Sequence, residues 1–143
     1  MEAAIHDLFA RYEKFFHQAL AGDLDADQLA ALYATDFIAA SPAGVRAGHN
    51  DQTLLRAMAQ GYDWYRKIGT TGMRIRSIRL DPIDPLHCLA HIGWSATYAR
   101  PDLPETTVDF ELHYLVQVID GVAKVFGWVA GDEQALLRQH GII

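Results

Sequence analysis

The sequence predicts an α+β fold in which helices gather on one side of a curved, mainly antiparallel sheet. In the first part of the chain, apolar residues recur at three- and four-residue steps, which is typical of amphipathic helices. From Gly72 onward the period becomes two, which is typical of strands. Because the helical and strand-like segments are separated along the chain, a βαβ architecture is excluded and the α+β class is favoured.

The clearest predicted helix ends at Gly22, a residue that commonly terminates helices. Its apolar stripe consists of Ile5, Leu8, Phe9, Tyr12, Phe15, Phe16, Ala19 and Leu20. Asp23 and Asp25 are N-cap candidates for a second, short helix that carries Leu29, Leu32 and Tyr33. A brief strand over residues 37–40 follows, and Ser41-Pro42-Ala43-Gly44 ends it.

A third helix is predicted from Asn50 or Asp51 to Lys67, and Gly61 inside it costs about 1 kcal/mol relative to alanine. Period-two alternation then predicts four strands, at residues 73–80, 88–99, 107–119 and 122–130. Asp120-Gly121 between the last two is a strong hairpin signal because both residues tolerate positive φ. Asp132 predicts the start of a terminal helix over residues 133–139.

Length and composition limit the classes of protein to which this chain can belong. With 143 residues, half of them apolar, we expect one domain that spans residues 1–143. The net charge of -6 and the lack of a Lys/Arg cluster argue against a nucleic-acid partner. Cys88 is the only cysteine, the first seven residues carry acids, and no run of about 18 apolar residues occurs, so we expect a soluble, cytoplasmic protein without membrane contact.

Several short sequence segments resemble those of the nuclear transport factor 2-like superfamily, and they occur in the same order. They are Arg11-Tyr12, Ala21-Gly22-Asp23-Leu24-Asp25, Ala31-Leu32-Tyr33-Ala34 before Asp36, and Asp120-Gly121 before Lys124-Val125. This superfamily includes SnoaL-like polyketide cyclases, ketosteroid isomerase, scytalone dehydratase and limonene epoxide hydrolase. The resemblance covers essentially the whole chain and implies a cone-shaped, cystatin-like fold. For activity it is far less specific, because this fold hosts enzymes and binding modules alike.

Ketosteroid isomerase activity is not expected from this resemblance. The isomerase's proton-abstracting acid stands before the proline that follows the first strand, and that position is Ser41 here. Its protonated acid aligns with Leu115, and its first-helix tyrosine matches Tyr12 or Phe15 equally well. Scytalone dehydratase uses two histidines on neighbouring strands, an acid and tyrosines. The resemblance to it implies His91 and His113, which lie on consecutive predicted strands, together with Asp36 and Tyr62. No convincing Asp-Arg-Asp set of the epoxide hydrolase type is present.

The two faces of the sheet allow two assignments. One face is almost wholly apolar and includes Val116, Val118 and Val125, whereas the other mixes polar and apolar residues. Either the apolar face packs against the helices, or it forms a homodimer interface while the mixed face lines a cavity. We favour the second assignment, in which a two-residue turn at Asp120-Gly121 places His113 opposite Trp128 and Leu115 opposite Phe126. A bulge would reverse this phase locally.

Under this assignment, His113 with Asp109 and Glu111 is the catalytic candidate, because imidazole moves protons near neutral pH and a carboxylate can orient it. The predicted ligand pocket consists of Trp94, Tyr98, Phe126, Trp128, Tyr62 and Tyr12. The alternatives are a strand histidine without a catalytic role and plain core packing of the aromatic rings.

No two histidines with an acid form a recognisable metal triad in the sequence, so no metal and no cofactor are expected. The predicted function is binding of a small apolar molecule. It extends to a cofactor-independent lyase, isomerase or cyclase reaction. The alternative is a non-catalytic dimeric interaction module.

Overall fold

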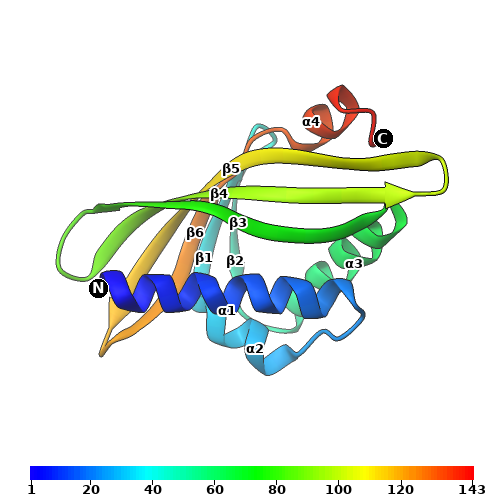
Figure 1. The fold of residues 1–143 in the computed structure, drawn as a ribbon. Helices are drawn as coiled ribbons and strands as arrows, with labels where there is room; N and C mark the ends of the chain where they lie inside the picture. Colours follow the sequence, from blue (N-terminus) through cyan, green and yellow to red (C-terminus); the bar gives the residue numbers. More distant parts are fainter.

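The computed structural model describes all residues 1–143, with four helices and six strands in the order that Figure 1 shows. The elements are α1 (Glu2–Leu20), α2 (Ala26–Leu32), β1 (Tyr33–Ser41), β2 (Gly44–His49), α3 (Gln52–Lys67), β3 (Thr70–Pro82), β4 (His87–Arg100), β5 (Leu103–Ile119), β6 (Val122–Val129) and α4 (Glu133–Gln139). None of the helices combines the length and apolar character that crossing a membrane requires.

All six strands form one curved sheet with the order β2-β1-β6-β5-β4-β3. Every neighbouring pair is antiparallel except β1 and β6, which run parallel. Figure 1 shows α1 lying across the sheet, with α2 beside it and α3 near its C-terminal end. The predicted α+β fold, with N-terminal helices on a curved and mainly antiparallel sheet, is confirmed.

Most element boundaries lie where the capping residues predict them. The side chain of Asp25 accepts backbone N–H bonds at the start of α2, and those of Asp51 and Asp132 do so for α3 and α4. At the β5–β6 turn, Asp120 has a φ of 53° and Gly121 a φ of 75°. The hairpin prediction is therefore confirmed, because both residues adopt the left-handed backbone that this turn type requires.

The edge of the sheet differs from the prediction. The first strand is longer than residues 37–40, and Tyr33 begins this strand instead of belonging to α2. The second strand, Gly44–His49, was not predicted at all. Five of its six residues are exposed, so it lacks the apolar alternation that marks a strand in a sequence.

The core lies between α1 and the face of the sheet that α1 covers, called the inner face below. Ile5, Leu8 and Phe9 of α1 are fully buried there. The inner-face residues Cys88, Ala90, Ile92, Trp94, Ala96, Tyr98, Val108, Tyr114, Val116, Val118, Ala123 and Val125 are also buried. A bond from Arg66 Nη1 to the Ala19 carbonyl oxygen, 2.7 Å long, ties α3 to the end of α1. The opposite side of the sheet is called the outer face.

Candidate functional site

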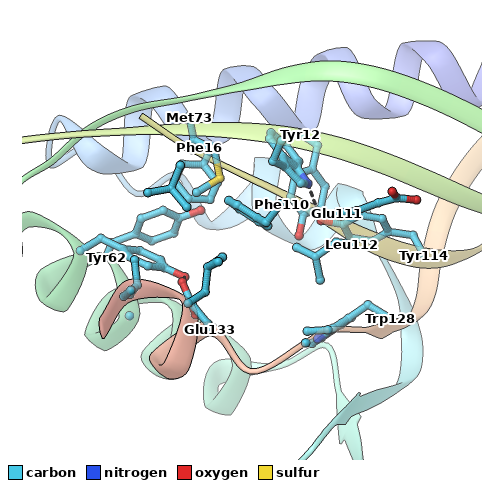
Figure 2. A pocket seen from close by; sticks show the side chains of 18 of the residues that line it. Tyr12, Phe16, Tyr62, Met73, Phe110, Glu111, Leu112, Tyr114, Trp128 and Glu133 are labelled. Atoms are coloured by element: carbon cyan, nitrogen blue, oxygen red, sulfur yellow. Dashed lines mark hydrogen bonds between the residues drawn. The ribbon is translucent and has the colours of Figure 1, made fainter. Parts of the chain in front are cut away.

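A cavity of about 500 Å³ opens on the inner face, between the sheet and helices α1, α3 and α4. Eighteen of its 23 lining residues are hydrophobic. The residues that Figure 2 labels on its wall are Tyr12, Phe16, Tyr62, Met73, Phe110, Glu111, Leu112, Tyr114, Trp128 and Glu133. Helix α3 contributes Met58 and Tyr62 to the wall, and α4 contributes Glu133 and Leu136. No histidine lines the cavity.

Three tyrosines and a tryptophan form the polar group at the inner end of the cavity. The Tyr12 and Tyr33 hydroxyl oxygens lie 2.6 Å apart. Trp94 Nε1 donates to the Tyr114 hydroxyl oxygen over 3.2 Å. The rings of Tyr12 and Tyr114 pack edge to face, with centroids 5.6 Å apart. These side chains come from α1, β1, β4 and β5, so the group joins four elements.

Burial raises the pKa of all three hydroxyls, so they remain protonated donors at neutral pH. The pKa of Tyr12 rises least, because hydrogen bonds from Tyr33 and Tyr114 offset part of the cost of burial. Loss of solvent comes first among the causes for Tyr33 and Tyr114, whose pKa values lie well above 10.0. Either hydroxyl of the Tyr12–Tyr33 pair can be the donor in their shared bond, so one of the two protons remains available to another acceptor.

Glu133 is the acid at the mouth of the cavity. The Tyr65 hydroxyl donates to its Oε1 over 2.9 Å. Glu133 as a residue is exposed, yet the loss of water around its carboxyl group raises its pKa, and the Tyr65 bond offsets only part of the rise. Burial, with a smaller contribution from the Glu133 charge, raises the pKa of nearby Tyr98 to about 12. Asp132, the other acid at this mouth, is occupied as the cap of α4.

The favoured assignment of the faces is wrong, because the apolar face packs against the helices and lines the cavity. Val116, Val118 and Val125 are buried in the core, so they cannot form a dimer interface. His113 and Asp109 lie on the outer face instead of the cavity wall. Alternation along a strand separates two sets of side chains, but it does not say which set the helices cover.

Glu111 borders the cavity through its position on β5, but its carboxylate serves the outer face. Its Oε1 lies 3.8 Å from His113 Nδ1 and 4.0 Å from Arg79 Nη2. Figure 2 shows the carboxylate turned away from Tyr62, Glu133 and Trp128. The charged and imidazole groups of the three residues predicted as a catalytic set therefore lie on the outer face, although Glu111 itself borders the cavity.

Five of the six predicted pocket residues line the cavity, namely Trp94, Tyr98, Trp128, Tyr62 and Tyr12. Phe126 does not, and its ring packs against His87 on the outer face. The register explains both outcomes, because a shift between Leu115 and Val116 makes Phe126 an extra, unpaired residue. The predicted pairing is therefore wrong, and Trp128 faces Tyr114 instead of His113.

Sequence reasoning missed Tyr33, Tyr114 and Glu133 as cavity residues. The sequence pattern places Tyr33 in the short helix, and it places Tyr114 on the apolar face for which a dimer interface is predicted. Glu133 stands directly after the helix cap Asp132, where an acid is explained by the helix dipole alone. A sequence signal existed for Tyr114 only, because it shares its face with Trp94 and Val116.

The positions carried over from ketosteroid isomerase and scytalone dehydratase are scattered. Ser41 is exposed at the end of β1, and Phe15 is buried in the core beside Tyr62. Leu115 lies on the outer face, where one of its side-chain atoms would be 3.0 Å from a Cβ at Gly127. Asp36 binds His49 at the edge of the sheet. Of these positions, only Tyr12 and Tyr62 border the cavity.

His91 and His113 face each other across β4 and β5 on the outer face, with their Nδ1 atoms 2.6 Å apart. Glu111 and these two histidines offer donor atoms that all lie within 4.8 Å of one another. The expectation of no metal rested on the absence of two histidines beside an acid. The structure brings such a set together from neighbouring strands, a pairing that the spacing of these residues along the sequence does not show.

The comparisons with known proteins agree with this fold. The sequence profile of a family described as NTF2-like protein (DUF6841) matches residues 2–133. No curated protein matches the chain significantly.

Solved structures with the same fold have low sequence identity to this chain. A Kribbella flavida protein is 12% identical, with a TM-score of 0.69 over 96% of this chain and 96% of the other. An uncharacterised Caulobacter vibrioides protein with a cystatin-like fold is 14% identical, with a TM-score of 0.64 over 96% and 94% of the chains. A ketosteroid isomerase-like protein from Erwinia carotovora is 15% identical, with a TM-score of 0.60 over 90% and 93%. These likenesses show the fold alone.

Proposed function

Because the chain belongs to the NTF2-like family DUF6841, we propose that it uses its cavity to bind an apolar, ring-containing molecule that carries a carbonyl oxygen. The observation that carries this proposal is the Tyr12 hydroxyl, which bonds the Tyr33 hydroxyl and packs beside Tyr114 on the wall of a mainly apolar cavity. Shape would select the ring, and Tyr12 would select the oxygen.

The size and composition of the cavity support this ligand class. Small-molecule sites have volumes of roughly 300–1,000 Å³ and apolar walls with a few placed polar groups. About 500 Å³ lined mainly by aromatic and aliphatic side chains fits that description. Anionic ligands fit poorly, because no Lys or Arg lines the wall.

A proton-transfer reaction on the bound ketone is the second part of the proposal. Glu133 would remove a proton from the carbon beside the carbonyl group, while Tyr12 donates to the developing oxyanion. A raised pKa makes Glu133 a stronger base than an ordinary carboxylate. Figure 2 shows Glu133 projecting from α4 and Tyr12 from α1, on different walls of the cavity. This arrangement would correspond to a cofactor-independent isomerase or lyase.

The binding test uses 1-tetralone and tetralin, two bicyclic probes that differ in the carbonyl oxygen. Quenching of tryptophan fluorescence should report both, since Trp94 and Trp128 line the cavity. Tyr12→Phe should weaken tetralone binding about 2- to 10-fold, the value of one hydrogen bond, and leave tetralin binding unchanged. Equal losses for both probes would contradict a role for the hydroxyl group.

A blocking variant tests the cavity itself. Gly61 borders the cavity, and a Cβ added there meets nothing within 4 Å. Gly61→Phe should therefore abolish binding of both probes by filling space, whereas the control Gly61→Ala should retain it. Undiminished binding in folded Gly61→Phe would place the probes elsewhere.

The reaction is tested by exchange of the tetralone α-protons in D₂O, followed by proton NMR. Exchange above the buffer rate should be lost in Glu133→Gln while tetralone binding persists. If Glu133→Gln exchanges as fast as the unaltered protein, Glu133 is not the base, and the binding proposal stands alone.

A further inference from the structure

The outer face carries a cluster of ionisable side chains that the cavity does not use. His91 and His113 form a direct cross-strand pair, and Asp81, Glu111 and Arg79 surround them. The side chain of His91 is 12% exposed and that of His113 is 37% exposed, so solvent reaches the pair from one side. Two imidazoles this close, at 2.6 Å between Nδ1 atoms, require a physical explanation.

The positions of the imidazole protons determine whether a metal ion can bind between the two rings. Asp81 Oδ2 lies 2.8 Å from His91 Nε2, so the carboxylate holds the proton of His91 on Nε2. Nδ1 of His91 then presents a lone pair to His113. At 2.6 Å the two Nδ1 atoms have room for one proton between them, not two. Any cation that replaces this proton meets two nitrogen lone pairs.

Glu111 supplies a third donor on the exposed side. Its Oε1 is 3.8 Å from His113 Nδ1, and its side chain is 48% exposed and can rotate. The donor atoms of the three residues lie within 4.8 Å of one another. Three protein ligands with one side open to water are typical of metal sites that keep a free coordination position.

We propose that His91, His113 and Glu111 bind a divalent transition-metal ion of the zinc type through two imidazole nitrogens and one carboxylate oxygen. Two nitrogens among three ligands favour zinc and cobalt over magnesium and calcium, which prefer oxygen ligands. With Zn–N bonds of about 2.0–2.1 Å, tetrahedral nitrogens lie roughly 3.3 Å apart, so the rings must separate by less than about 1 Å.

Asp81 acts as the outer-shell partner of this site. Metal-binding histidines usually donate their second N–H to a carboxylate, which fixes the ring and its tautomer. The Asp81–His91 bond has this arrangement before any ion is bound. Asp81 is therefore a positioning residue, and its replacement should weaken metal binding without abolishing it.

Arg79 opposes the ion electrostatically. Its Nη1 lies 3.1 Å from Asp81 Oδ2, and its Nη2 lies 4.0 Å from Glu111 Oε1. A bound metal ion must displace Arg79 from Glu111, but Arg79 can keep its bond to Asp81. Removal of this positive charge should therefore tighten metal binding.

Single histidine–acid pairs elsewhere on the surface give a matched control. His49 Nδ1 lies 2.5 Å from Asp36 Oδ1 at the edge of the sheet, and no second histidine accompanies them. If an ordinary exposed His–Asp pair were sufficient to bind zinc, His49→Gln would reduce binding as much as a change at His91 does.

The experiment titrates the tag-free full chain, freed of metal with a chelator, with Zn²⁺ by calorimetry and with Co²⁺ by visible absorption. One ion per chain should bind, with cobalt bands typical of nitrogen and oxygen ligands, and Mg²⁺ should give no signal. His91→Gln and His113→Gln should weaken Zn²⁺ binding by more than about 100-fold. Asp81→Asn should weaken it by roughly 10- to 100-fold, the range for outer-shell partners.

Three results would overturn the site. They are absence of stoichiometric binding, equal loss in His49→Gln, and unchanged affinity in both His91→Gln and His113→Gln. Arg79→Gln should increase affinity several-fold, and this gain keeps the proposal testable if a histidine variant folds poorly. No gain in Arg79→Gln would contradict the ion position beside Glu111. Circular dichroism checks the fold of every variant.

Discussion

The inner and outer faces of β4 and β5 are built from alternate residues of the same two strands, yet one is buried and mainly apolar and the other is charged and partly exposed. On the inner face, Trp94, Tyr98 and Tyr114 are buried, and the polar atoms of Trp94 and Tyr114 bond to each other. On the outer face, His91 and His113 meet among charged neighbours within reach of solvent. The aromatic cavity wall and the charged cluster thus lie on opposite sides of one sheet, so changes on one face should leave the other intact.

The largest expected difference between the faces is in stability. Ile92→Ala removes a fully buried inner-face side chain and should lower the free energy of unfolding by about 2–5 kcal/mol. Arg79→Ala on the outer face should change it by less than about 1 kcal/mol, because its ion pairs are exposed. Urea unfolding followed by circular dichroism measures both. Similar losses would show that the outer cluster also holds the sheet together.

An effect of intermediate size on stability is expected from the tyrosine hydroxyls at the inner end and at the mouth of the cavity. Tyr33→Phe removes the hydroxyl that bonds Tyr12 and should cost about 0.5–1.5 kcal/mol, because the bond is buried with few alternative partners. The Tyr65 hydroxyl bonds Glu133 at the solvated mouth of the cavity. Tyr65→Phe should therefore lower the free energy of unfolding by less than Tyr33→Phe does. The same urea unfolding compares the two variants. An equal cost would mean that the inner end of the cavity is as wet as its mouth.

A stabilising change is expected at the wall of the cavity. Gly61→Ala should raise the free energy of unfolding by about 0.5–1 kcal/mol, because alanine loses less backbone entropy in a helix and its Cβ meets no atom within 4 Å. Gly121→Ala is the control and should destabilise, since its φ of 75° strains any side chain. Thermal unfolding ranks the two variants. A loss in Gly61→Ala would indicate a contact that this open space does not account for.

The smallest effect concerns pH and the mouth of the cavity. The folded-state pKa of Glu133 is raised above its ordinary 4.5, so the folded chain binds this proton more tightly than the unfolded chain. The resulting stability is fully present below pH 4.5 and is lost as the pH rises through the folded pKa. The difference in stability between Glu133→Gln and the unaltered protein should therefore grow over that range, measured by urea unfolding at several pH values. A constant difference would contradict the raised pKa.

Local signals in the sequence were sufficient for most of the fold. Asp25, Asp51 and Asp132 cap helices where predicted, and Asp120-Gly121 forms the predicted turn. Each depends on a few neighbouring residues, so the sequence contains the whole explanation. Strand β2 could not be predicted because it has no apolar face and is held in the sheet only by its pairing with β1.

Five of the cavity aromatics could be predicted, but the cross-strand pairs of both candidate sites could not, because these pairs depend on register shifts. Counting back from the turn between Arg100 and Leu103 pairs His113 with Ala90. A shift between Tyr98 and Arg100 brings His91 opposite His113 instead. The shift at Phe126 likewise turns Trp128 to the inner face. A period-two pattern predicts which residues of one strand share a face. A bulge adds an unpaired residue and so changes which residues of neighbouring strands face each other, and the position of a bulge depends on packing.

The parallel pairing of β1 with β6 has a consequence for how the chain is made. Tyr33 pairs with Val125, so every residue between them must be synthesised before the β1–β2 hairpin can pair with β6. Contacts so distant in sequence close slowly. Until then the hairpin has an unprotected edge, with Ile38 and Val45 exposed even in the finished fold. Strand β6 lies between β1 and β5, so the emergence of this one strand from the ribosome both closes the open edge of the hairpin and completes the sheet.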